Sequence, residues 1–183
     1  MVTETTGSET ALVRDFVNTL HKDLYGDEEG LTTPAALAAW LAEHRLADGT
    51  TATRTDLEHA IELREALRAL LLANNGVEAD VEAAQRVLDA TARRGRVELR
   101  FADGEPALVP GAAGVSGALG RIVAAVHGAV TDGSWRRLKA CRAEDCQWAF
   151  VDHAKNQSRA WCSMSSCGNR AKARAHRERH RHA

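Results

Sequence analysis

The four cysteines of this 183-residue chain constrain its fold more than any other feature. All of them lie within residues 141–167, in two CxxxxC pairs that are separated by fifteen residues. Pairs of this kind are typical of a tetrahedral metal site, because each short loop brings two sulfurs to one ion. Thiolates select zinc over hard cations, and four protein ligands leave no position for a reactive water. We therefore predict one structural Zn²⁺, bound by Cys141, Cys146, Cys162 and Cys167.

Three alternatives to this zinc site stay open at the level of sequence. The four cysteines could form two disulfides, or they could bind an iron–sulfur cluster. His176 or His180, which share a helix face at positions i and i+4, could also replace one thiolate. The first twenty residues are acidic rather than basic, and no apolar run is long enough to cross a bilayer. We therefore expect a cytoplasmic protein without membrane contact, in which thiols stay reduced.

Charge divides the chain into two unlike parts. Residues 1–135 contain 12 Lys and Arg against 21 Asp and Glu, a net charge of −9. Residues 136–183 contain 12 against 4, a net charge of +8. Zinc with four thiolates adds about −2 to the second part, which leaves it cationic and suited to a polyanionic partner. We expect a disordered tail over residues 1–10, a helical domain over 11–134 and a zinc module over 135–183.

Apolar residues recur at the helical period in five stretches of the first domain. These stretches are residues 11–24, 33–48, 55–74, 78–93 and 116–131. Thr33, the capping-box pair Thr55 and Glu58, and Ser116 are expected to start three of these helices. Apolar and polar residues alternate over 97–109 instead, which predicts a β-hairpin. The fold class is therefore mostly α (α+β), with a helical domain and one hairpin before the zinc module.

The zinc module has the order of parts of a treble-clef-like fold. A first knuckle is followed by a hairpin that we expect around residues 148–151, and then by a second knuckle that leads into a helix. Four arginines of this helix fall within about 60° of one another on a helical wheel, namely Arg170, Arg174, Arg177 and Arg181. Like charges on one stripe repel, so the stripe indicates an anionic partner rather than only a solvated tail. We expect loss of zinc to unfold this module and to spare the helical domain.

Four strings of the sequence resemble two known families. They are WCSMSSCGNRAK at 161–172, RLKAC at 137–141, AFVDHAKNQSR at 149–159 and DFVNT at 15–19. The first three resemble the CGNR zinc finger, and the last resembles the ABATE domain that precedes it in such proteins. The resemblance implies a bacterial transcription regulator, which binds DNA through its zinc module and senses a ligand through its N-terminal domain.

Under this interpretation the zinc orders a helix that contacts phosphates or base edges, in a protein that we expect not to be an enzyme. Binding should weaken steeply with salt. The predicted DNA contacts are Lys155, Arg159, Asn169, Arg170, Lys172, Arg174 and Arg177. Asp15 and Asn18 are candidate contacts for a small-molecule effector, and a homodimer would read paired half-sites. A zinc-stabilised adaptor for RNA or an acidic protein is the alternative, and an enzyme that uses Asp15, Asn18 and His21 is the third hypothesis.

Overall fold

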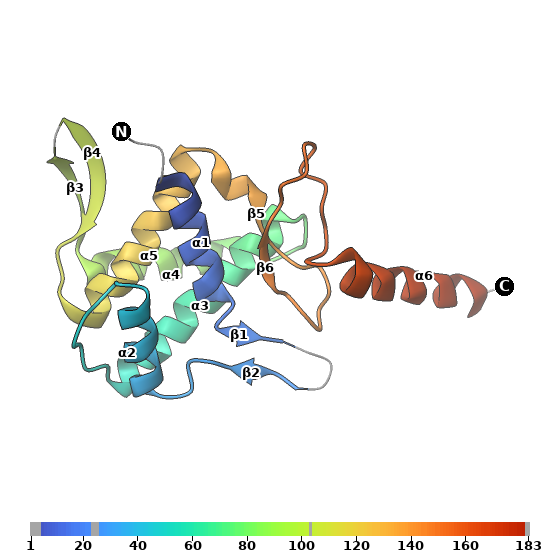
Figure 1. Cartoon of the computed structure of the whole chain (residues 1–183), viewed down its shortest axis with the longest axis horizontal. Helices are drawn as coiled ribbons and strands as arrows, with labels where there is room; N and C mark the ends of the chain where they lie inside the picture. Colours follow the sequence, from blue (N-terminus) through green and yellow to red (C-terminus); the bar gives the residue numbers. More distant parts are fainter. Residues whose placement is uncertain (1–4, 23–25, 103, 182–183) are drawn as a thin grey trace.

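The computed structural model describes residues 5–22, 26–102 and 104–181. Its helices confirm the predicted fold class, with five in the first domain and one at the end of the chain (Figure 1). They are α1 Thr5–Val17, α2 Pro34–Glu43, α3 Arg54–Asn74, α4 Val81–Gly95, α5 Gly114–Thr131 and α6 Asn169–Arg181. A 3-10 turn at Ser134–Arg137 follows α5, and a π-helical turn at Met164–Gly168 precedes α6.

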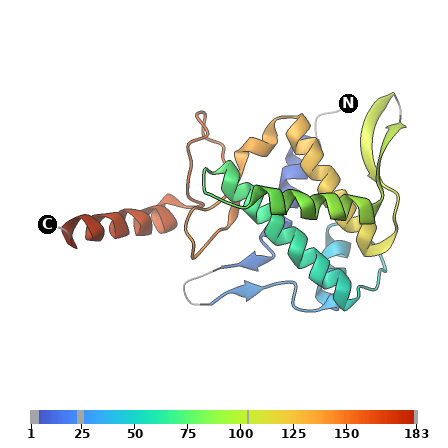
Figure 2. The ribbon, with the colours of Figure 1, turned by 180° about the vertical axis from the view of Figure 1, so that it is seen from behind.

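The strands form three separate antiparallel pairs, each of two strands. These are β1 Leu20–His21 with β2 Glu28–Glu29, β3 Val97–Ala102 with β4 Glu105–Pro110, and β5 Leu138–Ala140 with β6 Ala149–Val151. The predicted hairpin over 97–109 corresponds to β3 and β4. Figures 1 and 2 show this hairpin at one end of the molecule and α6 at the other.

Helix α3 lies at the centre of the first domain and packs against each of the other four helices there. Its buried leucines Leu63, Leu67 and Leu71 recur every four residues, so they line one face of the helix. Phe16 of α1 and Ile122 of α5 belong to the same core and are fully buried. The helical period in the sequence therefore predicts this core-facing side in part, since Leu67 and Leu71 are buried while Ile61 and Leu70 are only partly buried.

Two helix starts differ from the prediction. The capping box of α3 is formed by Thr53 and Asp56, not by Thr55 and Glu58: the Asp56 amide donates to the Thr53 hydroxyl, and the Thr53 amide donates to the Asp56 carboxylate at 2.8 Å. Helix α5 starts at Gly114 rather than at a Ser116 cap. Gly114 has a φ of 64°, which glycine tolerates, and this lets the chain turn into the helix earlier.

The first helix also lies elsewhere than predicted. It begins at Thr5, within the segment expected to be a disordered tail, of which residues 1–4 lie outside the described part of the chain. It ends at Val17 rather than near residue 24, and side chains satisfy its last carbonyls. The Thr19 hydroxyl donates to the Phe16 carbonyl, and Arg68 of α3 donates to the Val17 carbonyl at 2.8 Å.

The predicted position of the hairpin in the zinc module was also wrong. Strand β6 pairs with β5, which precedes the first two cysteines, so the first knuckle forms the tip of this hairpin. The register pairs Leu138 with Val151 and Ala140 with Ala149. Leu138, Ala140 and Ala149 are fully buried and belong to the same core as the helices. The hairpin is thus packed into the first domain, whereas α6 extends away from it (Figure 1).

Candidate metal centre

The four cysteine sulfurs meet at one point between β5, the first knuckle and the start of α6. All four lie within 4.8 Å of one another, and Cys162 Sγ is 3.6 Å from both Cys146 Sγ and Cys167 Sγ. Zinc–sulfur bonds of about 2.3 Å in a tetrahedron place sulfurs about 3.8 Å apart, so the cluster fits zinc closely. No disulfide joins these cysteines. This geometry bears out the prediction of one structural Zn²⁺.

Backbone turns explain how each pair of cysteines converges. In the first knuckle, the amides of Cys146 and Gln147 both donate to the Ala143 carbonyl at 3.0 Å, which folds the loop back on itself. In the second, Cys167 lies in the π-helical turn, and the Gly168 amide donates to the Ser163 carbonyl. A side chain at position 168 would lie 2.8 Å from the end of the Met164 side chain, which would have to move aside.

The electrostatics of the cluster favour a cation among the sulfurs. Hydrogen bonds from the neighbouring thiols of Cys146 and Cys162 lower the pKa of Cys141, so one thiolate forms readily. The hydrogen bond with Cys141 is in turn the main cause that raises the pKa of Cys146, and the same holds for Cys162. Four thiolates can therefore coexist only with a positive ion between them, which is the role of the zinc.

The histidine alternative receives no support from the described residues. Among the side chains that the structure describes, the group able to hold a metal consists of the four cysteines, and His176 is not part of it. The side chain of His180 lies outside the described part of the chain.

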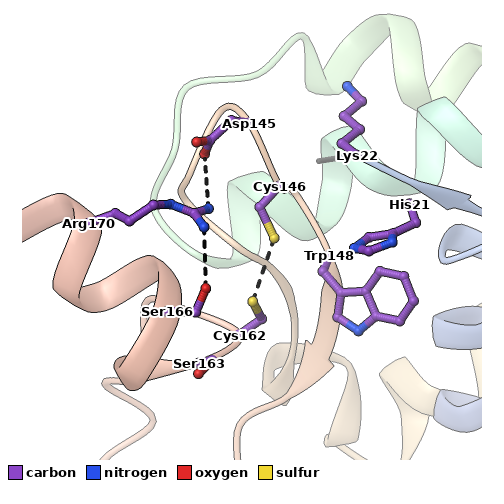
Figure 3. A pocket seen from close by; sticks show the side chains of 9 residues that line it. All are labelled: His21, Lys22, Asp145, Cys146, Trp148, Cys162, Ser163, Ser166 and Arg170. Atoms are coloured by element: carbon purple, nitrogen blue, oxygen red, sulfur yellow. Dashed lines mark hydrogen bonds and ion pairs between the residues drawn. The ribbon is translucent and has the colours of Figure 1, made fainter. Parts of the chain in front are cut away.

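Arg170 contacts the metal centre instead of pointing to solvent. Its Nη2 atom is 3.5 Å from Asp145 Oδ1, and its Nη1 atom donates to the Ser166 hydroxyl (Figure 3). The same Nη2 atom is 3.4 Å from Cys167 Sγ. A guanidinium beside a zinc-bound thiolate offsets negative charge and orients the ligand. The DNA contact of Arg170 stays a prediction, while within the protein its guanidinium supports the metal centre.

Arg159 has a similar internal role. Its guanidinium lies 4.9 Å from the centre of the Phe150 ring and donates to the carbonyls of Trp161, at 2.9 Å, and Cys162. These contacts hold the loop that carries the third ligand. A contact of Arg159 to the DNA backbone stays a prediction, while within the protein this cation helps to build the zinc module.

The other predicted DNA contacts remain on the surface. Lys155, Lys172 and Arg177 are exposed. Arg174 is half exposed, with Nη1 3.9 Å from Asp145 Oδ2. Asn169 is exposed at the start of α6, and its amide donates to the Ser165 carbonyl at 3.2 Å. The stripe of four arginines is therefore divided, because its first two members turn toward Asp145.

A buried ion pair that has no signal in the sequence organises the loop between the two knuckles. Lys139 Nζ donates to Asp152 Oδ2 at 2.8 Å, and the two side chains are 6% and 0% exposed. Asp152 also accepts hydrogen bonds from the amides of Ala154 and Arg159. Burial would raise the pKa of Asp152, but the hydrogen bonds from Lys139 and from these amides hold it below its ordinary value.

Polar side chains of the helical domain bind the backbone of the zinc module directly. The Asn18 amide donates to the Ala149 carbonyl at 3.0 Å and accepts from the Ala149 amide at 2.8 Å, as a neighbouring strand would do. At the end of α3, Asn75 donates to the carbonyls of Ala140 and Ala160. Arg68, which is 2% exposed, donates to the Gln147 carbonyl at 2.9 Å.

The candidate effector residues lie at this same junction. An open hollow of about 520 Å³ between α1 and β6 is lined by Asp15, Asn18, Trp148, His153 and others. Asp15 pairs with its neighbour Arg14 at 2.8 Å. His21 packs edge-on against Trp148, and its Nδ1 atom is 3.7 Å from Glu28 Oε2, which is too long for a hydrogen bond.

Comparison with known families divides the chain where its charge changes. The ABATE profile, described as "Putative stress-induced transcription regulator", matches residues 10–133, which is more than half of the chain. The CGNR zinc finger profile matches residues 137–180. No curated protein matches the chain at a significant level. Among the described residues, no helix is long and apolar enough to cross a bilayer.

Proposed function

Because the chain belongs to the ABATE family and carries a CGNR zinc finger, we propose that it regulates transcription by binding duplex DNA through α6. The observation that carries this proposal is the combination of charge and position in that helix. Helix α6 contains six Lys and Arg and one Glu, a net charge of +5, and it extends beyond the rest of the molecule (Figure 2). A protruding cationic helix can enter a groove or follow phosphates without moving the helical domain.

The contacts to DNA come from the outer residues of this helix. Lys172, Arg177, Arg179 and Arg181 are exposed, and they lie on more than one face of α6. Arg170 supports the metal centre, so the zinc fixes the base of the helix while its outer part meets the nucleic acid. The acidic helical domain, by contrast, would be repelled by phosphates, which leaves the zinc module, with Lys155 and above all α6, as the contacting part.

Salt-dependent binding of duplex DNA to the intact zinc protein tests this proposal. Lys172→Ala combined with Arg177→Ala should weaken binding and reduce the slope of log K against log salt by about 0.9 for each phosphate that the variant no longer neutralises. Arg93→Ala with Arg94→Ala is the matched control, because it removes two exposed cations from α4. Equal weakening by both pairs, or a preference for RNA over duplex DNA at fixed salt, would count against DNA as the partner and against α6 as its site.

We also propose that a small-molecule effector binds the hollow between α1 and β6. Its lining combines Asp15 and Asn18 from the helical domain with Trp148 and His153 from the zinc module. A small polar molecule in this position would contact both parts, and its binding energy would act on the junction that holds α6 in place. Differential affinity for two arrangements of this junction is what a regulatory ligand requires.

A further inference from the structure

The hairpin of β3 and β4 presents apolar side chains to solvent at the end of the molecule opposite α6 (Figures 1 and 2). Leu99 is 57% exposed and Phe101 is 75% exposed. Both lie on the same face of β3 as Val97, since side chains alternate along a strand. Neither zinc binding nor the proposed DNA binding by α6 uses this surface.

The two edges of the hairpin differ in their capacity to pair with another strand. Proline has no N–H, so Phe101–Pro106 and Val97–Pro110 are non-hydrogen-bonded pairs of the ladder. Hydrogen-bonded and non-hydrogen-bonded pairs alternate along an antiparallel ladder, so Leu99–Leu108 is also a non-hydrogen-bonded pair. In such pairs the backbone groups point away from the partner strand. The outer edge of β4 thus has prolines at two of its three donor positions, which blocks pairing.

The outer edge of β3, in contrast, has all of its donors and acceptors. Val97, Leu99 and Phe101 each direct an N–H and a C=O away from β4. Within the described part of the chain, β3 pairs only with β4. An open edge beside an exposed apolar face is a template for a further strand.

The sequence of β3 is complementary to itself in the antiparallel direction. We propose that β3 pairs with β3 of a second copy of the chain, with Leu99 opposite Leu99 of the partner subunit, so that the two hairpins form one four-stranded sheet. This register places Glu98 opposite Arg100 of the partner subunit, and Val97 opposite Phe101 of the partner subunit. The outward backbone groups of Val97, Leu99 and Phe101 then all find partners.

Glu98 and Arg100 pair with each other within β3 at 3.2 Å, and the proposed register lets each also face its opposite charge in a second copy, which favours a second copy as the occupant. A two-fold axis at Leu99 repeats both the Glu98–Arg100 pairing and the apolar contacts, which needs the same segment on each side. Because the prolines of β4 block the other edge, pairing stops at two chains and does not continue into a fibre. In this dimer the two α6 helices lie away from the interface.

Charge reversal tests the register. Glu98→Arg or Arg100→Glu alone replaces two attractive cross-strand pairs by two repulsive pairs, and each should raise the dimer Kd roughly tenfold or more in sedimentation equilibrium. The combined variant Glu98→Arg with Arg100→Glu restores opposite charges in the same register, and its Kd should return to near the parent value. Arg86→Glu, the same reversal at an exposed ion pair on α4, should leave the Kd unchanged.

Leu99→Pro tests the edge itself. It removes an outward N–H and leaves the β3–β4 hydrogen bonds in place, as Pro106 and Pro110 already do, so the variant should keep the parent melting temperature and sediment as a monomer. A parent chain that stays monomeric up to its solubility limit overturns the proposal. So does a dimer that tolerates both single reversals or Leu99→Pro. DNA binding by α6 is measured separately and does not depend on these outcomes.

Discussion

At the scale of single residues, Asn18 shows how one side chain can join two parts of a protein. Its amide bonds both the N–H and the C=O of Ala149, so it takes the place of a third strand beside β6. Backbone groups left unpaired away from water cost as much as a lost hydrogen bond. Asn18 is therefore structural in the free protein, even though it also lines the hollow proposed for an effector.

We expect Asn18→Ala to lower the free energy of unfolding by about 1–3 kcal/mol, because it strands both groups of Ala149. Asp15→Ala is the control, since Asp15 makes only a half-exposed pair with Arg14, and it should cost less than about 1 kcal/mol. Urea unfolding at constant zinc content measures both. If an effector binds the hollow, Asp15→Ala should also lose the stabilisation that the ligand gives the parent. Equal stability of Asn18→Ala and the parent would contradict the structural role.

Lys139 and Asp152 form the most buried ion pair of the zinc module. The folded pKa of Asp152 lies below its unfolded value of about 3.9, so the pair contributes fully above that pH and its contribution is lost as the pH falls through the folded value. Lys139→Met should cost about 3–5 kcal/mol at pH 7, because it leaves a buried carboxylate without its cation.

The pH dependence of this variant separates charge from packing. Burial without Lys139 should raise the pKa of Asp152, so the stability deficit should shrink as the pH falls and the carboxyl becomes neutral. Lys155→Met, in the same loop but exposed, should cost almost nothing at any pH. Denaturant unfolding of the three proteins between neutral and mildly acid pH gives the comparison. A deficit equal to that of Lys155→Met would refute the role of the pair.

Residues whose chemistry is local could be predicted from the sequence, and residues whose partners are distant could not. The four zinc ligands could be predicted because the two cysteines of each pair are close in sequence, and cysteine pairs at such spacing are typical of a metal site. Arg170 and Arg159 look like free cations in the sequence, since their partners, Asp145 and the backbone near Cys162, are set by the fold. The buried ion pair of Lys139 could not be predicted, because no residue near it in the sequence indicates that Asp152 becomes its buried partner.

At the scale of elements, helices were easier to predict than their ends and their strand partners. The period of buried residues identified all five helices of the first domain. The end of α1 depends on Arg68, which is 51 residues away in the sequence, and local pattern cannot contain that information. Strand β5 lies before the first knuckle and its partner β6 lies after it. A hairpin expected wholly after Cys146 therefore has the wrong first strand.

At the scale of the whole molecule, the zinc module and the helical domain share one core. Leu138, Ala140 and Ala149 are buried with the helices, and Asn18, Asn75 and Arg68 bond the backbone of the module. The expectation that zinc loss would spare the helical domain therefore needs revision. The metal holds the hairpin tip, and the hairpin completes the core.

Removal of zinc should destabilise the helices as well as the module. We expect Cys146→Ser to lower the free energy of unfolding by roughly 3–5 kcal/mol, since release of the hairpin exposes Leu138 and opens a cavity beside α3. Amide hydrogen exchange should show faster exchange in both α3 and β5. Ser165→Ala, in the second knuckle but not a ligand, is the control. Unchanged protection in α3 after removal of zinc would show that the two parts are independent.

The contacts of Asn18, Arg68 and Asn75 also bear on how such a gene can be rearranged. A recombination joint near residue 134 follows the boundary between the two family profiles, yet it separates each of these side chains from its backbone partner. A finger transferred to another protein would carry an uncovered leucine and unbonded strand groups with it. We therefore expect the finger to keep its fold best beside a helical domain that supplies the same three side chains.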